Sequence, residues 1–328
     1  MKNTRVMQIL GYGPPSVLVP GHMAMPTLAP GEVRIQTIAA AVNHTDLKIR
    51  AGTWPIRKAH PFPYVPGVEV IGRISDIGSS VSNWSVGQTV ITLMQGLGGV
   101  RAERTGSYAD FVTVDVDALA LVPDTVDPLA MASLGLGAVT AFEGIRRMGP
   151  VDGRRVLVTG AAGGVGSAAV SIARALGASV TGVVARPTQA QYVRDLGADE
   201  VIVVERDSPP SLATASVDAV LDSVGGPLFN ACVQALRERG ALVLVGAVGG
   251  GDVSLDAWQL IRPVTLTGYS TETLEGKDLR VAMARISDWL RTQSIRVPDY
   301  QVFPMQSAAE AHLLLERGGI SGRVLLVP

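Results

Sequence analysis

The chain has 328 residues, a formal net charge of −1, and 47% hydrophobic against 17% charged residues. This length accommodates about two domains with their own cores, and the composition excludes a mainly disordered chain. A charge near zero gives no basic surface for nucleic acid. No run reaches the ~18 apolar residues of a membrane span, and the single cysteine, Cys232, excludes an intrachain disulfide. We expect a cytoplasmic globular protein with no nucleic-acid or membrane partner.

The N-terminal third reads as short strands separated by turns, with little helical periodicity. These strands are predicted at residues 33–42, 68–77, 88–93 and 108–114. From Leu129 onward helical and strand patterns alternate, and six strands with helices between them predict a doubly wound parallel sheet. The six are centred near Val156, Val180, Val201, Ala219, Leu242 and Val264. The remaining helices and strands come after the sixth strand, so we expect them to pack back onto the N-terminal domain.

Residues 156–166 read VLVTGAAGGVG, an apolar run that ends in a glycine-rich turn and opens a helical pattern. Such a turn lets the backbone approach a pyrophosphate, which the helix dipole and free amides then face. Alanine replaces the first glycine of the strict pattern, so a purely structural turn is the alternative. The stop at Gly177 and a second strand at residues 180–184 complete the βαβ unit that the motif requires. We predict cofactor contacts at Gly160, Ala161, Gly163, Gly164, Val165 and Gly166.

The end of the second strand indicates which dinucleotide to expect. About 20 residues beyond the last glycine, an NAD-binding chain places Asp or Glu on the ribose hydroxyls. This chain has Ala185 and Arg186 there. A guanidinium can pair with a 2′-phosphate, and such a charge-assisted bond contributes about 1.5 to 3 kcal/mol. The sequence predicts NADPH rather than NADH, with a solvated loop arginine as the alternative.

Further motifs occur along nearly the whole chain. They are GPPSVL at 13–18, VNHTDLKIRAG at 42–52, VPGVEVIGRISDIGSSVSNWSVGQTV at 65–90, GSYADFV at 106–112, LGADEVI at 196–202 and DAVLDSVGG at 218–226. In this order they resemble the medium-chain dehydrogenase/reductase superfamily, specifically its zinc-free quinone oxidoreductase (zeta-crystallin-like) branch. The resemblance implies an α/β protein: a GroES-like, mostly-β catalytic domain (1–125, completed by 269–328) and a Rossmann doubly wound parallel sheet domain (126–268). It also implies a homodimer joined at a Rossmann sheet edge, for which residues 264–266 are the candidate strand.

Zinc alcohol dehydrogenases of this superfamily carry Cys-His-Thr-Asp and Gly-His-Glu, whose cysteine and second histidine bind catalytic zinc. This chain reads Asn43-His44-Thr45-Asp46 and Gly67-Val68-Glu69, so two of the three protein ligands are replaced. The spacing of His44, His60, Asp46 and Glu69 matches no other ligand set, and we expect no metal. Without a Lewis acid, reduction of a plain ketone is harder. A quinone or an α,β-unsaturated carbonyl needs less help, because its delocalised anion can be stabilised by hydrogen-bond donors.

The resemblance therefore implies a reductase that transfers hydride from NADPH to a quinone or an α,β-unsaturated carbonyl. Asn43 is expected beside the nicotinamide, donating to substrate or orienting cofactor, with His44 next to it. Thr45 matches a proton-relay hydroxyl of the zinc enzymes, and Asp46 is expected to orient the loop. Trp54 stands where related reductases carry tyrosine; indole can stack on a planar substrate but cannot readily deliver a proton. Three more cofactor contacts are expected at strand or helix ends: Thr140, Asp222 and Gly246.

Two alternatives stay open. An enoyl-thioester reductase of a polyketide or fatty-acyl pathway is weakened by Trp54, and a crystallin-type structural protein would keep the cofactor fold without turnover. The family often holds the 2′-phosphate with a lysine and a tyrosine where this chain has Gln189 and Val204. Arg186 would then hold the phosphate largely alone. The polar loop at residues 98–106 is expected near the substrate mouth.

Overall fold

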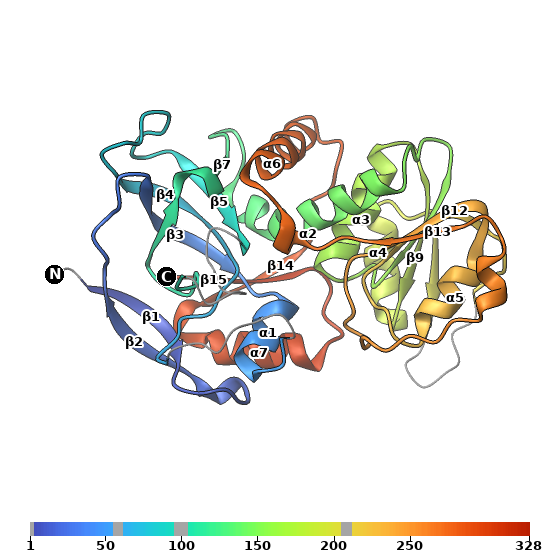
Figure 1. The fold of residues 1–328 in the computed structure, drawn as a ribbon, viewed down its shortest axis with the longest axis horizontal. Helices are drawn as coiled ribbons and strands as arrows, with labels where there is room; N and C mark the ends of the chain where they lie inside the picture. The colour runs from blue at the N-terminus through green and yellow to red at the C-terminus, as the bar shows by residue number, and fades with distance from the viewer. Residues whose placement is uncertain (1–2, 55–61, 95–103, 205–211) are drawn as a thin grey trace.

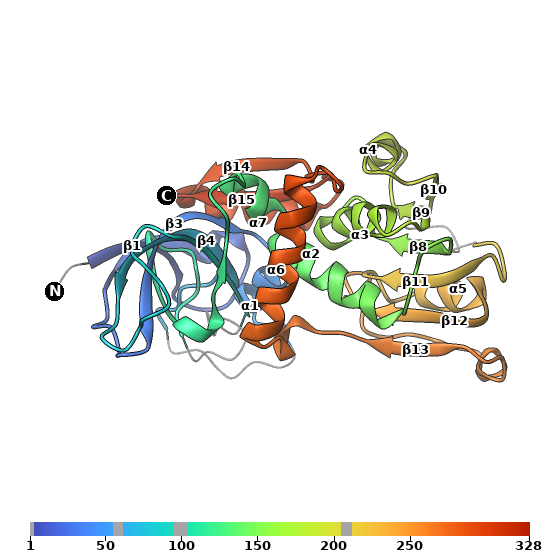
Figure 2. The ribbon, with the colours of Figure 1, turned by 90° about the horizontal axis from the view of Figure 1, so that it is seen from above.

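The computed structural model describes residues 3–54, 62–94, 104–204 and 212–328. Two lobes lie side by side, and both ends of the chain belong to the same lobe (Figure 1). The lobe with the chain ends holds the mixed sheet, and the other holds a sheet made only of parallel strands. The long helix α2 (Pro128–Arg147) runs between them (Figure 2).

The parallel sheet has six strands in the order β10-β9-β8-β11-β12-β13. This order confirms the predicted doubly wound sheet, since the first strand in sequence lies at the centre and the chain winds outward in both directions. The strands are β8 (Arg155–Thr159), β9 (Ser179–Val184), β10 (Glu200–Val203), β11 (Val217–Asp222), β12 (Leu236–Leu244) and β13 (Thr265–Gly268). The connecting helices are α3 (Gly164–Ala175), α4 (Ala190–Asp195) and α5 (Leu228–Ala235). Strand β13 is an edge, as expected for residues 264–266.

The other lobe is mostly β, as the sequence indicates. Its sheet has the order β14-β15-β3-β4-β5-β7, with β6 also paired to β3. The strands are β3 (Glu32–Ala41), β4 (Glu69–Ile77), β5 (Thr89–Leu93), β6 (Phe111–Asp115), β7 (Ala120–Leu121), β14 (Tyr300–Pro304) and β15 (Arg323–Val327). A separate hairpin joins β1 (Asn3–Ile9) to β2 (Leu18–Ala24). The expected return of the C-terminal segment is therefore seen directly in the pairing of β15 with β3. The domain limits at 125/126 and 268/269 stay a prediction.

Helix α1 (His44–Ala51) is a correction to the sequence analysis, which predicted no helix in this region. The helix is short and has no strong amphipathic pattern, so its stability comes from its cap and its packing rather than from propensity. Its first turn is closed by a capping box between Asn43 and Asp46, and Gly52 ends it in the left-handed region with φ 83°.

Helix α7 (Ala308–Arg317) packs beside α1 and is fixed there by buried polar groups. The Arg50 side chain, buried in α1, forms an ion pair with Glu316 of α7. The Tyr108 hydroxyl and the His312 Nε2 atom lie 2.8 Å apart in a hydrogen bond. Burial, and secondarily the Arg50 charge, lowers the pKa of His312 to about 3, so its ring is neutral. The ion pair attaches α7 to α1, and the hydrogen bond attaches it to the segment before β6.

Helix α2 also corrects the expectation about apolar stretches. By length and composition its residues 128–147 could cross a membrane, but 78% of the most apolar window is buried inside the protein. It packs against α3, β3, β4 and α6 (Gly276–Arg291), so it touches both lobes. Helix α2 is therefore a buried core helix that connects the two lobes.

Candidate active site

The glycine turn lies between β8 and α3, where the sequence predicted it. Gly160 has a φ of 59°, and a Cβ atom added at Gly166 would overlap the carbonyl oxygen of Gly160. Gly163 is the N-cap of α3. Within the described part of the chain, the backbone N–H groups of Gly164, Val165 and Gly166 donate no hydrogen bond. Three free amides at the positive end of a helix form a cradle for an anion.

The floor beside this turn is formed by the carboxyl ends of β8, β11 and β12. Asp222 Oδ1 accepts a hydrogen bond from Thr159 Oγ1 at 2.6 Å and others from the amides of Val224 and Gly225. The Asp222 carboxylate thus links the carboxyl ends of β8 and β11. A Cβ atom added at Gly246 would lie 2.9 Å from the Ser223 carbonyl oxygen, so the chain there needs glycine for close approach.

Arg186 follows β9 at the edge of the same crevice. Its side chain is exposed and makes no hydrogen bond or ion pair with any residue that the structure describes. The guanidinium lies against Gly319, in the loop that connects α7 to β15. Thr140, on α2, is buried and donates to the Leu136 carbonyl oxygen at 2.7 Å, which leaves its oxygen lone pairs free to accept.

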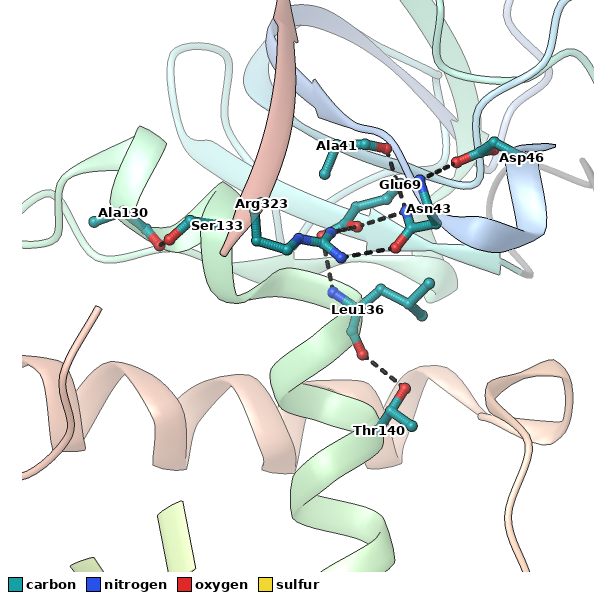
Figure 3. A network of polar contacts seen from close by, with 9 residues as sticks. All are labelled: Ala41, Asn43, Asp46, Glu69, Ala130, Ser133, Leu136, Thr140 and Arg323. Carbon is teal, nitrogen blue, oxygen red and sulfur yellow. Dashed lines mark hydrogen bonds and ion pairs between the residues drawn. The ribbon is translucent and has the colours of Figure 1, made fainter. Parts of the chain in front are cut away.

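Four chain segments meet at Glu69, which opens β4. One carboxylate oxygen, Oε1, accepts from the Leu136 amide at 2.8 Å, while Oε2 accepts from Asn43 Nδ2 at 3.0 Å and from Arg323 Nη2 at 2.7 Å (Figure 3). Arg323 Nη1 also donates to Asn43 Oδ1 at 3.0 Å. The exposed fractions are 1% for Glu69, 6% for Arg323 and 7% for Asn43, so the network is buried. We call Asn43, Glu69, Leu136 and Arg323 the junction.

The junction depends on a break in α2. Gly135 has φ 23° and ψ −121°, which are not helical values, and Leu136 begins a new run of helix behind it. A Cβ atom at position 135 would overlap Glu69 Oε1. Glycine therefore lets a carboxylate from the other lobe cap the second half of α2, where the helix dipole favours a negative charge.

Arg323 also reaches the glycine turn. A Cβ atom added at Gly164 would lie 2.6 Å from Arg323 Nη1, so the guanidinium stands directly beside the free amides of α3. Its Nε atom is buried without a hydrogen-bond partner among the described residues. The Arg323 guanidinium thus joins Asn43 and Glu69 to the free amides at the start of α3.

The junction restricts what Asn43 can do. Its Nδ2 hydrogens are both used, one on Glu69 and one on the Ala41 carbonyl oxygen at 3.2 Å, and its Oδ1 accepts from Arg323. Donation from Asn43 to a substrate would require one of these bonds to break. Thr45, by contrast, is half-buried, and its hydroxyl has no partner in the described structure. Thr45 is therefore an available donor next to the junction.

His44 and Asp46 flank Thr45 with opposite environments. The His44 ring reaches solvent, but crowding by protein, with the charges of Arg323 and Lys48, lowers its pKa to about 4 and keeps it neutral. Asp46 is fully buried and caps the Asn43 amide at 2.8 Å. Burial raises the pKa of Asp46 to about 7, and its Oδ1 atom has no partner among the described residues.

Trp54 lies just beyond α1 and is half-buried, with its indole Nε1 buried and unpartnered in the part of the chain described. Residues 98–103 of the predicted substrate loop, and His60, lie outside the described residues. Within the described ranges, no group of three or more His, Cys, Asp or Glu side chains is placed to hold a metal ion.

Comparisons with known proteins agree with this arrangement. Residues 29–124 match the family described as "Alcohol dehydrogenase GroES-like domain", and residues 164–288 match "Zinc-binding dehydrogenase". The 2-methylene-furan-3-one reductase of Solanum lycopersicum is 32% identical over 323 residues, which cover 97% of this chain and 77% of that protein.

The chain belongs to the medium-chain dehydrogenase/reductase superfamily. The predicted superfamily and the predicted GroES-like and Rossmann fold are therefore confirmed. A quinone oxidoreductase of Sus scrofa is 27% identical, covering 98% of this chain and 97% of that protein. A solved mycobacterial protein complexed with NADPH is 31% identical with a TM-score of 0.83, covering 99% of this chain and 100% of the other.

The sequence analysis did not identify the junction as a whole. It considered Glu69 only as a metal ligand and passed over Arg323 and Gly135. One local signal was present: Arg323 opens the run RVLLVP, whose next three residues are fully buried, and a charge at the start of such a strand demands a partner. The partners themselves lie 254 and 280 residues away, where no local pattern points to them.

Replacement of Gly135 by alanine should destabilise the protein by about 3 kcal/mol or more, because it displaces Glu69 from a buried ion pair. The free energy of unfolding in urea measures this loss. The matched control is Gly149→Ala, where φ is 79° but no atom lies within 4 Å of the added Cβ. That variant should lose only the roughly 1–2 kcal/mol of left-handed backbone strain. Equal losses in the two variants would contradict the capping role of Glu69.

Asp46→Asn should make the protein progressively more stable than the wild type as pH rises. The pKa of the Asp46 carboxyl is raised to about 7 in the folded state, so ionisation costs stability between about pH 4 and 7. The stability difference should therefore grow by up to roughly 4 kcal/mol from pH 4 to pH 8. Urea unfolding at both values measures it, with the exposed Asp124→Asn as control. A difference that shrinks with rising pH would show that the Asp46 charge stabilises the cap.

Proposed function

We propose that this protein is an NADPH-dependent, zinc-independent reductase of quinones or α,β-unsaturated carbonyls. One observation carries the proposal. The glycine turn, with its three free amides, lies beside Asn43 and Glu69, and the Arg323 guanidinium binds these two residues where the zinc enzymes of the superfamily hold their metal. The names of the relatives support the same reaction class, since one reduces an enone, one a quinone, and one structure contains NADPH.

The residues at the turn fit a dinucleotide. The amides of Gly164, Val165 and Gly166 and the Arg323 guanidinium would hold the pyrophosphate, because all of them are donors at one end of α3. Gly246 and the Asp222 turn would leave room for the nicotinamide half, with Thr140 as a hydrogen-bond acceptor on α2. Arg186, which is exposed and has no ion-pair partner among the described residues, would hold the 2′-phosphate. When bound, NADPH supplies the hydride.

The donor set at the metal position does not fit zinc. Asn43 offers no thiolate, Val68 offers no ligand, and the Arg323 guanidinium lies within hydrogen-bond distance of both Asn43 and Glu69. A permanent positive charge there opposes binding of a divalent cation, and it already pairs with the Glu69 carboxylate. The match to a family described as zinc-binding therefore concerns its fold and not this site.

Hydride arriving at a conjugated carbon places negative charge on the carbonyl oxygen, and the site must stabilise that charge and supply a proton. Thr45 can donate its free hydroxyl hydrogen to this oxygen. Asn43, held in the junction, positions the start of α1 and so positions Thr45. His44 is neutral, so it adds a hydrogen-bonding group without a charge, and Trp54 would offer an apolar ring to a planar substrate.

We place the protein in the cytoplasm as a homodimer, without nucleic-acid or membrane partners. The edge strand β13 supports the dimer, because its outer backbone groups have no strand partner in the described sheet. Large apolar side chains next to it are exposed, with Trp258 at 77% and Ile261 at 71%. An exposed apolar patch beside an open edge is typical of a subunit contact.

Purified protein should oxidise NADPH in the presence of ortho- or para-quinones or enones, and a metal chelator should leave the rate unchanged, since no step needs zinc. Absorbance at 340 nm follows the reaction. Enoyl thioesters form the third arm of the panel: turnover of these alone would favour the enoyl-thioester reductase. Binding of NADPH without turnover of any acceptor would favour the structural role, and inhibition by the chelator would refute the zinc-free reaction.

Thr45→Val should lower kcat by about a hundredfold, the usual loss when a donor to a developing oxyanion is removed. The affinity for NADPH, measured by fluorescence titration, should change little, because the side chain keeps its shape. Thr113→Val, on β6 and outside the junction, is the matched control and should keep full activity. An unchanged kcat in Thr45→Val would assign the donor role to another group.

A further inference from the structure

We call the lobe with the mixed sheet the catalytic lobe and the lobe with the parallel sheet the cofactor lobe. The loop between α7 and β15 belongs in sequence to the catalytic lobe, but it contacts the cofactor lobe at several points. The Gly322 amide donates to the Ala162 carbonyl oxygen at 2.8 Å, just before the helix of the glycine turn. Gln189 Nε2 donates to the Ile320 carbonyl oxygen at 3.1 Å. These bonds hold the loop against the glycine turn at Ala162 and against the turn that follows β9 at Gln189.

Arg186 is the third contact. A Cβ atom added at Gly319 would overlap the Arg186 guanidinium and would lie 2.8 Å from its Nε atom. Gly319 has a φ of 82°, so glycine here satisfies both the backbone and the space that the guanidinium needs. The Arg186 guanidinium thus packs directly against the backbone of Gly319, and it has no charged partner among the described residues.

The same loop offers unused donors. The backbone N–H groups of Gly319, Ile320 and Ser321 donate no hydrogen bond within the described chain, whereas the next amide, that of Gly322, does. Consecutive free amides beside a guanidinium combine a full positive charge with oriented dipoles. A phosphate monoester, with its oxygens spread in three directions, is the ligand that this arrangement suits.

We infer that residues 319–321 complete the 2′-phosphate subsite and that Gly319 is a positioning residue for Arg186. This inference rests on the proposed use of NADPH and assigns a role in binding it to the loop at residues 319–321. Selectivity for NADPH over NADH is then set across the boundary between the lobes, by the cofactor lobe's arginine and the catalytic lobe's loop together.

Gln189 supports this assignment. The resemblance places a phosphate-binding lysine at this position, but the Gln189 side chain is buried and its amide is turned toward Ile320. It clamps the Arg186 turn to the loop through a backbone oxygen and leaves the loop amides free. In the inferred subsite, the backbone amides of residues 319–321 replace the lysine as donors to the 2′-phosphate.

The test is the ratio of kcat/KM for NADPH to kcat/KM for NADH, with one quinone, in Gly319→Ala. Alanine should displace the guanidinium and lower this ratio roughly tenfold through the NADPH value, while the NADH value changes less than twofold. Arg186→Ala should lower the ratio about ten- to a hundredfold. In the double variant, Gly319→Ala should add nothing to Arg186→Ala, because its effect acts through that side chain.

A second readout separates this inference from the proposed function. Calorimetric binding of 2′,5′-ADP and 5′-AMP reports the 2′-phosphate subsite without catalysis, and Gly319→Ala should weaken only 2′,5′-ADP. Wild-type preference for NADPH with an unchanged ratio in Gly319→Ala would overturn the role of the loop and leave the reductase intact. A wild type that prefers neither NADPH nor 2′,5′-ADP would overturn both. An equal fall for both cofactors, or a persistent effect without Arg186, would also refute the positioning role.

Discussion

The buried ion pair between Glu69 and Arg323 is the interaction on which the rest of the site depends. Two charges removed from water cost several kcal/mol each, and that cost is offset only when the remaining hydrogen-bonding positions are filled. Here Glu69 also accepts from Asn43 and from the Leu136 amide, and Arg323 also donates to Asn43. The pair is therefore stable only if β4, α1, α2 and β15 are all in place, and it fixes their relative positions in return.

Under the proposed zinc-free function, the same contacts hold the site in shape without a metal ion. A catalytic zinc site gathers its ligands around one divalent cation; the Arg323 guanidinium gathers Asn43 and Glu69 in a similar way, with hydrogen bonds instead of coordination. The proposed reaction uses no Lewis acid, which favours acceptors whose negative charge is delocalised. The Thr45 hydroxyl, next to Asn43 in sequence, has no hydrogen-bond partner among the described residues.

The parts of this structure that could be predicted from the sequence are those with a local pattern. The strands of the parallel sheet, the glycine turn and Arg186 each show their character within about ten residues, through apolar runs, glycine spacing or a charge at a strand end. Helix α1 escaped prediction because its stability comes from a cap and from buried contacts with α7, neither of which leaves a periodic signal. The junction could not be predicted because each of its bonds joins residues far apart in the sequence. Only the structure shows that the side-chain amide of Asn43 has its hydrogen-bonding groups occupied within the protein.

The pairing of β15 with β3 also orders events during synthesis. Strand β3 leaves the ribosome early, but the arginine that fills the site next to its end is made 280 residues after Asn43. The parallel sheet, whose strands all lie between residues 155 and 268, can form in the meantime. All strands of the parallel sheet are therefore available for folding before Arg323 can complete the junction. Glu69 remains without its counter-charge until β15 has been made, so the junction is the later of the two to close.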